Sequence, residues 1–84
     1  MKDRRFGKFA ISAQLMEADK HTVCMALSGC VVVRCEMIYA YDNFEYTAWR
    51  SDFAQVPEGE IIPWYDVLIL DYGNKIEFKK RESE

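Results

Sequence analysis

The chain has 84 residues, the length of one small domain over residues 1–84, and this excludes a second independent core. Half of the residues are hydrophobic and 14% are aromatic, so the composition lies outside the disordered class and predicts a packed core. The formal net charge of −3 argues against a general basic surface for nucleic acid.

The first third of the chain allows two interpretations. Apolar side chains alternate along residues 6–15, which predicts a strand. We expect a helix over residues 19–28, because Asp19 can cap its start and Gly29 can end it. The alternative is a strand over Thr22–Leu27, which would give an all-β meander.

Two β-rich runs follow, separated by a dipeptide typical of tight turns. Val31–Tyr41 shows period-two alternation, and Phe44–Trp49 resumes it after Asp42-Asn43. A two-residue turn there predicts a hairpin in which Trp49 lies opposite Glu36. One face would carry Tyr39, Tyr41, Phe44 and Tyr46, and the other Arg34, Glu36, Glu45, Thr47 and Trp49.

A second hairpin is predicted near the end of the chain, after a connecting loop at 51–64 that contains both prolines. Its strands are Tyr65–Tyr72 and Lys75–Lys80, joined by a Gly73-Asn74 turn. The lysines of the last strand mark it as a sheet edge, and residues 81–84 read as a frayed tail.

These elements predict an α+β fold. We expect a four- or five-stranded antiparallel sheet with two hairpins, backed by one short helix.

The sequence favours neither a metal protein nor an enzyme. Cys24, Cys30 and Cys35 are odd in number and are expected to be free thiols that pack as small core hydrophobes. Together with His21 they lack the close ligand pairs of a zinc site. No phosphate-binding glycine loop or nucleophile motif is present, so we expect no catalysis and no cofactor.

Targeting signals are also missing from the sequence. No apolar run is long enough to cross a bilayer, and the residues at the start lack the pattern of a signal peptide. We therefore expect a cytoplasmic protein without a membrane partner.

Acidic residues are concentrated in the second half, where residues 36–71 hold eight acids and a single base, Arg50. Both tryptophans lie in the same stretch, and tryptophan is enriched among the residues that dominate protein interfaces. This predicts an acidic, aromatic surface that binds a protein with a basic surface, such as a nucleic-acid-binding complex. The candidate contact residues are Glu36, Glu45, Trp49, Asp52, Glu58, Glu60, Trp64 and Tyr65.

The alternative function is binding of single-stranded nucleic acid or a nucleotide through the aromatic face at residues 39–46. Direct nucleic-acid binding is disfavoured because Asp42 and Glu45 lie among these rings. In its short length, its acidity and its lack of a catalytic motif, the chain resembles phage-encoded accessory proteins, including inhibitors of host defence complexes. That resemblance implies a non-catalytic inhibitor, and the high apolar fraction would also allow a homodimer.

Overall fold

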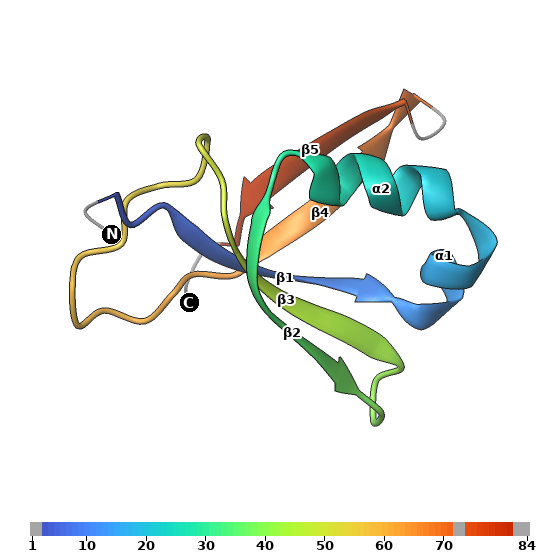
Figure 1. Cartoon of the computed structure of the whole chain (residues 1–84), viewed down its shortest axis with the longest axis horizontal. Coiled ribbons are helices and arrows are strands. Elements are labelled where there is room, and N and C mark those ends of the chain that lie inside the picture. Colours follow the sequence, from blue (N-terminus) through green and yellow to red (C-terminus); the bar gives the residue numbers. More distant parts are fainter. Residues whose placement is uncertain (1–2, 72–73, 82–84) are drawn as a thin grey trace.

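Five antiparallel strands in two sheets and two short helices make up the computed structural model, which describes residues 3–71 and 74–81 (Figure 1). The strands are β1 (Phe6–Ser12), β2 (Val31–Ile38), β3 (Asn43–Trp49), β4 (Tyr65–Leu70) and β5 (Lys75–Lys80), and the helices are α1 (Ala13–Ala18) and α2 (Lys20–Ser28). Sheet A has the order β1-β3-β2, and sheet B is the β4–β5 hairpin. The broad α+β class is confirmed, whereas the single sheet and single helix were wrong.

Both helices begin at side chains that accept a hydrogen bond from the first turn. Ser12 accepts from the Leu15 amide at 3.1 Å, so β1 ends there and α1 replaces the last part of the strand predicted over 6–15. Asp19 caps α2 by accepting from the amide and hydroxyl of Thr22, which confirms the predicted helix and excludes the meander.

Neither helix, and no other helix among the described residues, is long and apolar enough to cross a membrane.

The β2–β3 hairpin has a longer turn than predicted. β2 ends at Ile38, residues 39–42 form the loop, and Asp42 adopts a left-handed φ of 53°. Hydrogen bonds from the Tyr41 amide to the Ile38 carbonyl and from the Asp42 amide to the Tyr39 carbonyl, each 3.3 Å, reverse the chain early. The predicted two-residue turn and its register are therefore wrong: Glu36 lies opposite Glu45, and Trp49 lies opposite Val31.

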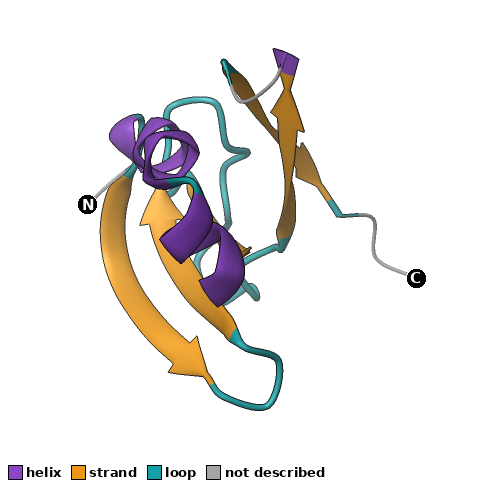
Figure 2. Cartoon of the chain, turned by 90° about the vertical axis from the view of Figure 1, so that its right-hand side faces the viewer, coloured by secondary structure: helices purple, strands orange, loops and turns teal. Residues whose placement is uncertain are grey.

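Sheet B is a two-stranded hairpin whose strands pair from Tyr65 with Lys80 to Leu70 with Lys75. Its two strands confirm the predicted second hairpin, although β4 ends at Leu70 rather than at residue 72. Position 73 of the predicted Gly73-Asn74 turn lies outside the described residues, as do residues 82–84 of the predicted tail. Figure 2 shows the hairpin and sheet A as two separate layers, and in Figure 1 the start of β4 reaches β1.

An aromatic cluster joins the two sheets. Phe9 of β1 stacks on Tyr46 of β3 with ring centroids 5.3 Å apart, and it meets Phe78 of β5 edge-on at 4.9 Å. Phe53, from the loop after β3, stacks on Tyr65 of β4 at 4.1 Å and also contacts Phe78 edge-on. These contacts, with Ile11, Val23, Ala26 and Ala48, form the buried core.

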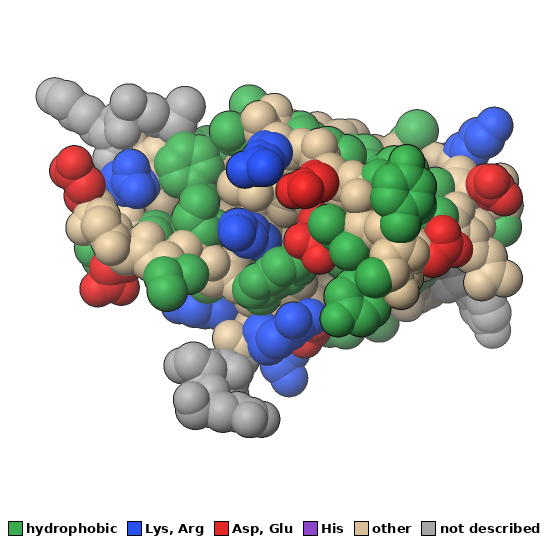
Figure 3. Space-filling view, turned by 90° about the horizontal axis from the view of Figure 1, so that it is seen from below, with side chains coloured by type: hydrophobic (Ala, Val, Ile, Leu, Met, Phe, Trp, Pro, Cys, Tyr) green, Lys and Arg blue, Asp and Glu red, His purple; other side chains and the backbone are tan. Residues whose placement is uncertain are grey.

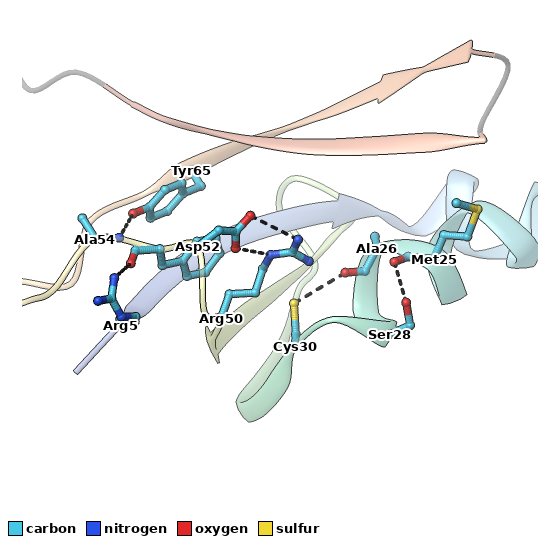
Figure 4. A network of polar contacts seen from close by, with 10 residues as sticks. Arg5, Met25, Ala26, Ser28, Cys30, Arg50, Asp52, Ala54 and Tyr65 are labelled. Atoms are coloured by element: carbon cyan, nitrogen blue, oxygen red, sulfur yellow. Dashed lines mark hydrogen bonds and ion pairs between the residues drawn. The ribbon is translucent and has the colours of Figure 1, made fainter. Parts of the chain in front are cut away.

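Arg50, just after β3, ties three parts of the chain together (Figure 4). Its guanidinium lies 4.6 Å from the centroid of the Phe78 ring, and it donates to the Asp52 carboxylate at 2.6 and 3.2 Å. The same group lies against Gly29 at the end of α2, where a cation is favoured by the helix dipole. Arg50 thus links sheet A, the helix end and sheet B.

The close approach of the two sheets at Gly7 gives a test of this packing. A Cβ atom at Gly7 would lie 2.7 Å from carbon atoms of both Phe53 and Tyr65, so we expect Gly7→Ala to lower the free energy of unfolding by about 1–3 kcal/mol. In the matched change Gly29→Ala the added carbon meets only the end of the flexible Arg50 side chain, and the loss should be smaller. Urea denaturation measures both, and equal losses would contradict this packing.

Candidate binding surface on the outer face of sheet A

Sheet A has one covered face and one open face. Alternate residues of β1 and β3, namely Gly7, Phe9, Ile11, Tyr46 and Ala48, are buried toward the helices and sheet B. The residues between them point the other way, because side chains alternate along a strand. We call this side the outer face: it comprises Phe6, Lys8 and Ala10 of β1, Glu45, Thr47 and Trp49 of β3, and Arg34 and Glu36 of β2.

Trp64 extends the outer face beyond β1. The Lys8 amide donates to the Pro63 carbonyl at 2.9 Å, and Lys8 and Trp64 form a parallel bridge. Since Tyr65 is buried in the core, the alternation of side chains directs Trp64 to the outer side. Trp64, Lys8, Thr47 and Arg34 consequently lie in one row across the sheet.

Three aromatic rings and several arginines share this face. Phe6 and Trp49 are directly paired across β1 and β3, and both are half-buried, as is Trp64. The Arg4 guanidinium lies 5.8 Å from the Phe6 ring centroid, and that of Arg81 lies 5.5 Å from the Trp64 ring centroid. Figure 3, seen from the sheet A side, shows hydrophobic side chains interspersed with both charges. The face is therefore aromatic and mixed in charge rather than uniformly acidic.

Two carboxylates oppose each other on the outer face. Glu36 and Glu45 are direct cross-strand partners, an arrangement in which like charges destabilise the sheet. Arg34 lies 3.4 Å from the Glu36 carboxylate, but Glu45 forms no ion pair with any residue that the structure describes. Lys8 and Arg34 line the same small depression as the two acids. A further cation there would relieve the repulsion.

The structure brings together only half of the predicted contact residues. Glu36, Glu45 and Trp49 lie on sheet A, and Trp64 borders them. Glu58 and Glu60 lie exposed in the loop after β3. Glu60 and Trp64 line an open groove with Ile61, Ile62, Pro63, Lys80 and Arg81.

Two predicted contact residues are engaged inside the chain. The Asp52 carboxylate is held by Arg50, whose hydrogen bonds lower the pKa of that carboxyl. Tyr65 is 5% exposed and its hydroxyl accepts from the Ala54 amide at 3.0 Å. Tyr65 therefore lies in the core of the chain and not on its outer face.

The predicted aromatic face at residues 39–46 does not assemble. Tyr39 and Tyr41 are 86% and 74% exposed in the loop, whereas Tyr46 is buried and Phe44 packs against the core. Burial raises the pKa of the Tyr46 hydroxyl to about 12, and the neighbouring Cys35 thiol adds to the effect. The early turn explains the correction, since it removes Tyr39 and Tyr41 from the strand.

The cysteines also differ from expectation. All three are free thiols, but Cys24 and Cys35 are exposed, so the prediction that they pack in the core was wrong. Only Cys30 packs partly against the core, where burial raises the pKa of its thiol. Within residues 3–71 and 74–81, no three His, Cys, Asp or Glu side chains are grouped as metal ligands.

Phe6, Lys8, Arg4 and Arg81 were missed as surface residues. The alternation over residues 6–12 separates Phe6 and Lys8 from the buried Phe9, so it carried a signal for their common face. No feature of the sequence indicated that β1 would pair with β3 rather than with β2. Comparisons of the chain with protein-family models, curated proteins and solved structures find no match.

Trp49 offers a test of the outer face. Its indole Nε1 is buried and has no hydrogen-bond partner among the described residues, and an unpaired buried donor costs about 1–3 kcal/mol. Trp49→Phe removes the donor while keeping a ring, so we expect a change below about 1 kcal/mol in the free energy of unfolding. Trp49→Ala should cost about 2–3 kcal/mol through lost contacts. Equal losses in chemical denaturation would show that the indole N–H is bonded.

The Arg50–Asp52 ion pair predicts an acid-dependent contribution to stability. Because the folded-state pKa of Asp52 is lowered, the pair stabilises the fold at neutral pH and loses this effect as the pH falls below about 4, through the folded pKa. We expect Asp52→Asn to lower the melting temperature at neutral pH, and we expect its difference from wild type to shrink as acid titration carries the pH below the folded pKa. A difference that stays the same throughout the acid titration would contradict the account.

Proposed function

We propose that the protein is a non-catalytic binding module that contacts a protein partner through the outer face of sheet A. The observation that carries this proposal is the presence of Phe6, Trp49 and Trp64 on one open sheet face, with arginines against two of the rings. Tryptophan and arginine are the residue types most enriched among those that dominate interface energies.

The opposed carboxylates support a partner with basic side chains. A lysine or arginine of the partner placed between Glu36 and Glu45 would replace a repulsive contact by two attractive ones. Glu58 and Glu60, exposed in the neighbouring loop, would add long-range attraction. This keeps the expected basic partner and centres the proposed site on sheet A, with the loop at its border.

The groove beside Trp64 would extend the contact. It has a volume of about 940 Å³, and its apolar wall contains Ile61, which is 91% exposed. An exposed isoleucine next to a tryptophan suits an apolar side chain of a protein partner. Inhibition of a host defence complex would be one role for such a module. Identifying the bound partner would show whether the module has that role.

Binding of single-stranded nucleic acid is the second candidate, favoured by a different set of rings from those at residues 39–46. Arg4, Lys8 and Arg81 lie next to Phe6 and Trp64, and rings flanked by bases are the elements of single-strand binding surfaces. The carboxylates of Glu36 and Glu45 on the same face oppose a phosphate backbone.

Affinity capture with charge variants tests the proposal. The immobilised protein is exposed to lysate with and without nuclease, and each captured protein is then purified and its affinity measured. We expect Glu45→Lys to weaken binding and flatten its dependence on salt, and Trp64→Ala to cost about 2 kcal/mol of binding free energy. Glu17→Lys, the same charge change on exposed α1, is the matched control and should bind as wild type does.

Each outcome distinguishes the candidates. Capture that survives nuclease and falls with Glu45→Lys but not with Glu17→Lys supports the protein-binding proposal. Capture that is lost with nuclease, together with binding of a labelled single-stranded oligonucleotide that Glu45→Lys strengthens, would favour nucleic acid instead. Affinities that neither outer-face change alters would overturn both.

A further inference from the structure

Strand β2 presents an unpaired edge with little protection. The order β1-β3-β2 leaves one side of β2 without a strand neighbour among the described residues. Residues 31–36 are all exposed, including Val31 at 58% and Val33 at 61%. Such an edge offers backbone hydrogen-bonding groups to another strand.

Strand β5 shows how an edge strand of this chain is protected. It carries Lys75, Lys79 and Lys80, and lysines are a common means of blocking edge pairing. β2 contains neither lysine nor proline over its eight residues. Its one irregularity is the shift in pairing between Val32 and Arg34, which leaves the segment 34–38 in regular register with β3.

Symmetry limits how β2 could pair with the β2 of a second copy. In a continuous antiparallel sheet the two-fold axis is perpendicular to the sheet, and directly opposed residues point to the same side. The axis must therefore pass midway between one residue and the same residue of the second copy, which lie directly opposite each other. Centring on Arg34 or on Glu36 would oppose two like charges, at Arg34 or at Glu36 respectively.

Centring the axis on Cys35 gives a self-complementary arrangement. Arg34 then lies opposite Glu36 of the second copy, and Glu36 lies opposite its Arg34. Within each chain these two residues already approach to 3.4 Å, so four alternating charges would surround the axis on the outer face. The next pair outward brings Met37 against the exposed Val33.

We propose that the chain forms a two-fold symmetric homodimer in which two β2 edges pair antiparallel with Cys35 at the axis. The two copies of sheet A then form one six-stranded sheet, and their outer faces become continuous. This inference does not depend on the proposed function. It rests on the free edge of β2, whereas the proposed function rests on the outer face of sheet A and a different protein partner.

Charge exchange tests the register. Light scattering or sedimentation over a dilution series should show wild type as a dimer, and Arg34→Glu or Glu36→Arg alone should weaken self-association at least about tenfold, because each creates two like-charge pairs. Mixing the two single variants should restore dimers that contain one of each, and the double variant Arg34→Glu/Glu36→Arg should dimerise alone. Glu36→Arg removes the repulsion with Glu45 but also the ion pair with Arg34, so the melting temperature of each single variant is measured beside its self-association, and an unchanged value separates dissociation from unfolding.

Cross-linking through the native thiols gives a second readout. Paired strands place opposed Cα atoms about 4.5–5.5 Å apart, within disulfide range, so mild oxidation should join two chains through Cys35. Cys24→Ser should cross-link as wild type does, and Cys35→Ser should not. A monomeric wild type at every concentration, or mixed single variants that stay monomeric, would overturn the proposal. Equal cross-linking of Cys35→Ser and wild type would exclude the axis at Cys35.

Discussion

The contact between Phe9, Phe53, Tyr65 and Phe78 is the constraint on which the remaining structure depends. A two-stranded hairpin is marginal on its own, and β4–β5 gains its stability by placing Tyr65 and Phe78 against rings from sheet A and from the loop after β3. The loop is fixed by the same contact, since Phe53 stacks on Tyr65 and meets Phe78 edge-on, and the Ala54 amide donates to the Tyr65 hydroxyl. Gly7 is required where it lies because no side chain fits between β1 and this pair of rings.

The cluster also decides which parts of sheet A remain available. By drawing the helices and sheet B to one side, it covers the face with Phe9 and Tyr46 and leaves the opposite face and the β2 edge uncovered. The proposed partner surface and the proposed dimer edge are consequences of this one-sided packing. The carboxylates of Glu36 and Glu45 repel each other across the outer face of the free protein, and the proposed basic partner would relieve that repulsion.

Local signals in the sequence predicted local structure well. Asp19 and Gly29 bounded α2, and the alternation of residues 31–38 and 75–80 identified two strands. The turn after β2 was mispredicted because Asp42-Asn43 resembles a tight turn, whereas the chain reverses from Ile38 onward with Asp42 alone in the left-handed region. The division into two sheets depends on contacts between distant rings. The ion pair of Asp66 with Arg81 likewise joins residues that no local pattern connects. No local sequence pattern predicts these ring contacts or this ion pair, because the residues that form them are brought together only by the fold.

Amide hydrogen exchange resolved by residue tests the central claim, that one aromatic cluster makes both sheets a single cooperative unit with an open edge. The account predicts that amides of β4 and β5 exchange with the same free energy as those of β1 and β3, because neither sheet opens without breaking the cluster. It also predicts that only β2 gains protection as the protein concentration rises. Exchange in β4 and β5 at a much lower free energy than in β3 would contradict it, since the hairpin would then open without disturbing sheet A.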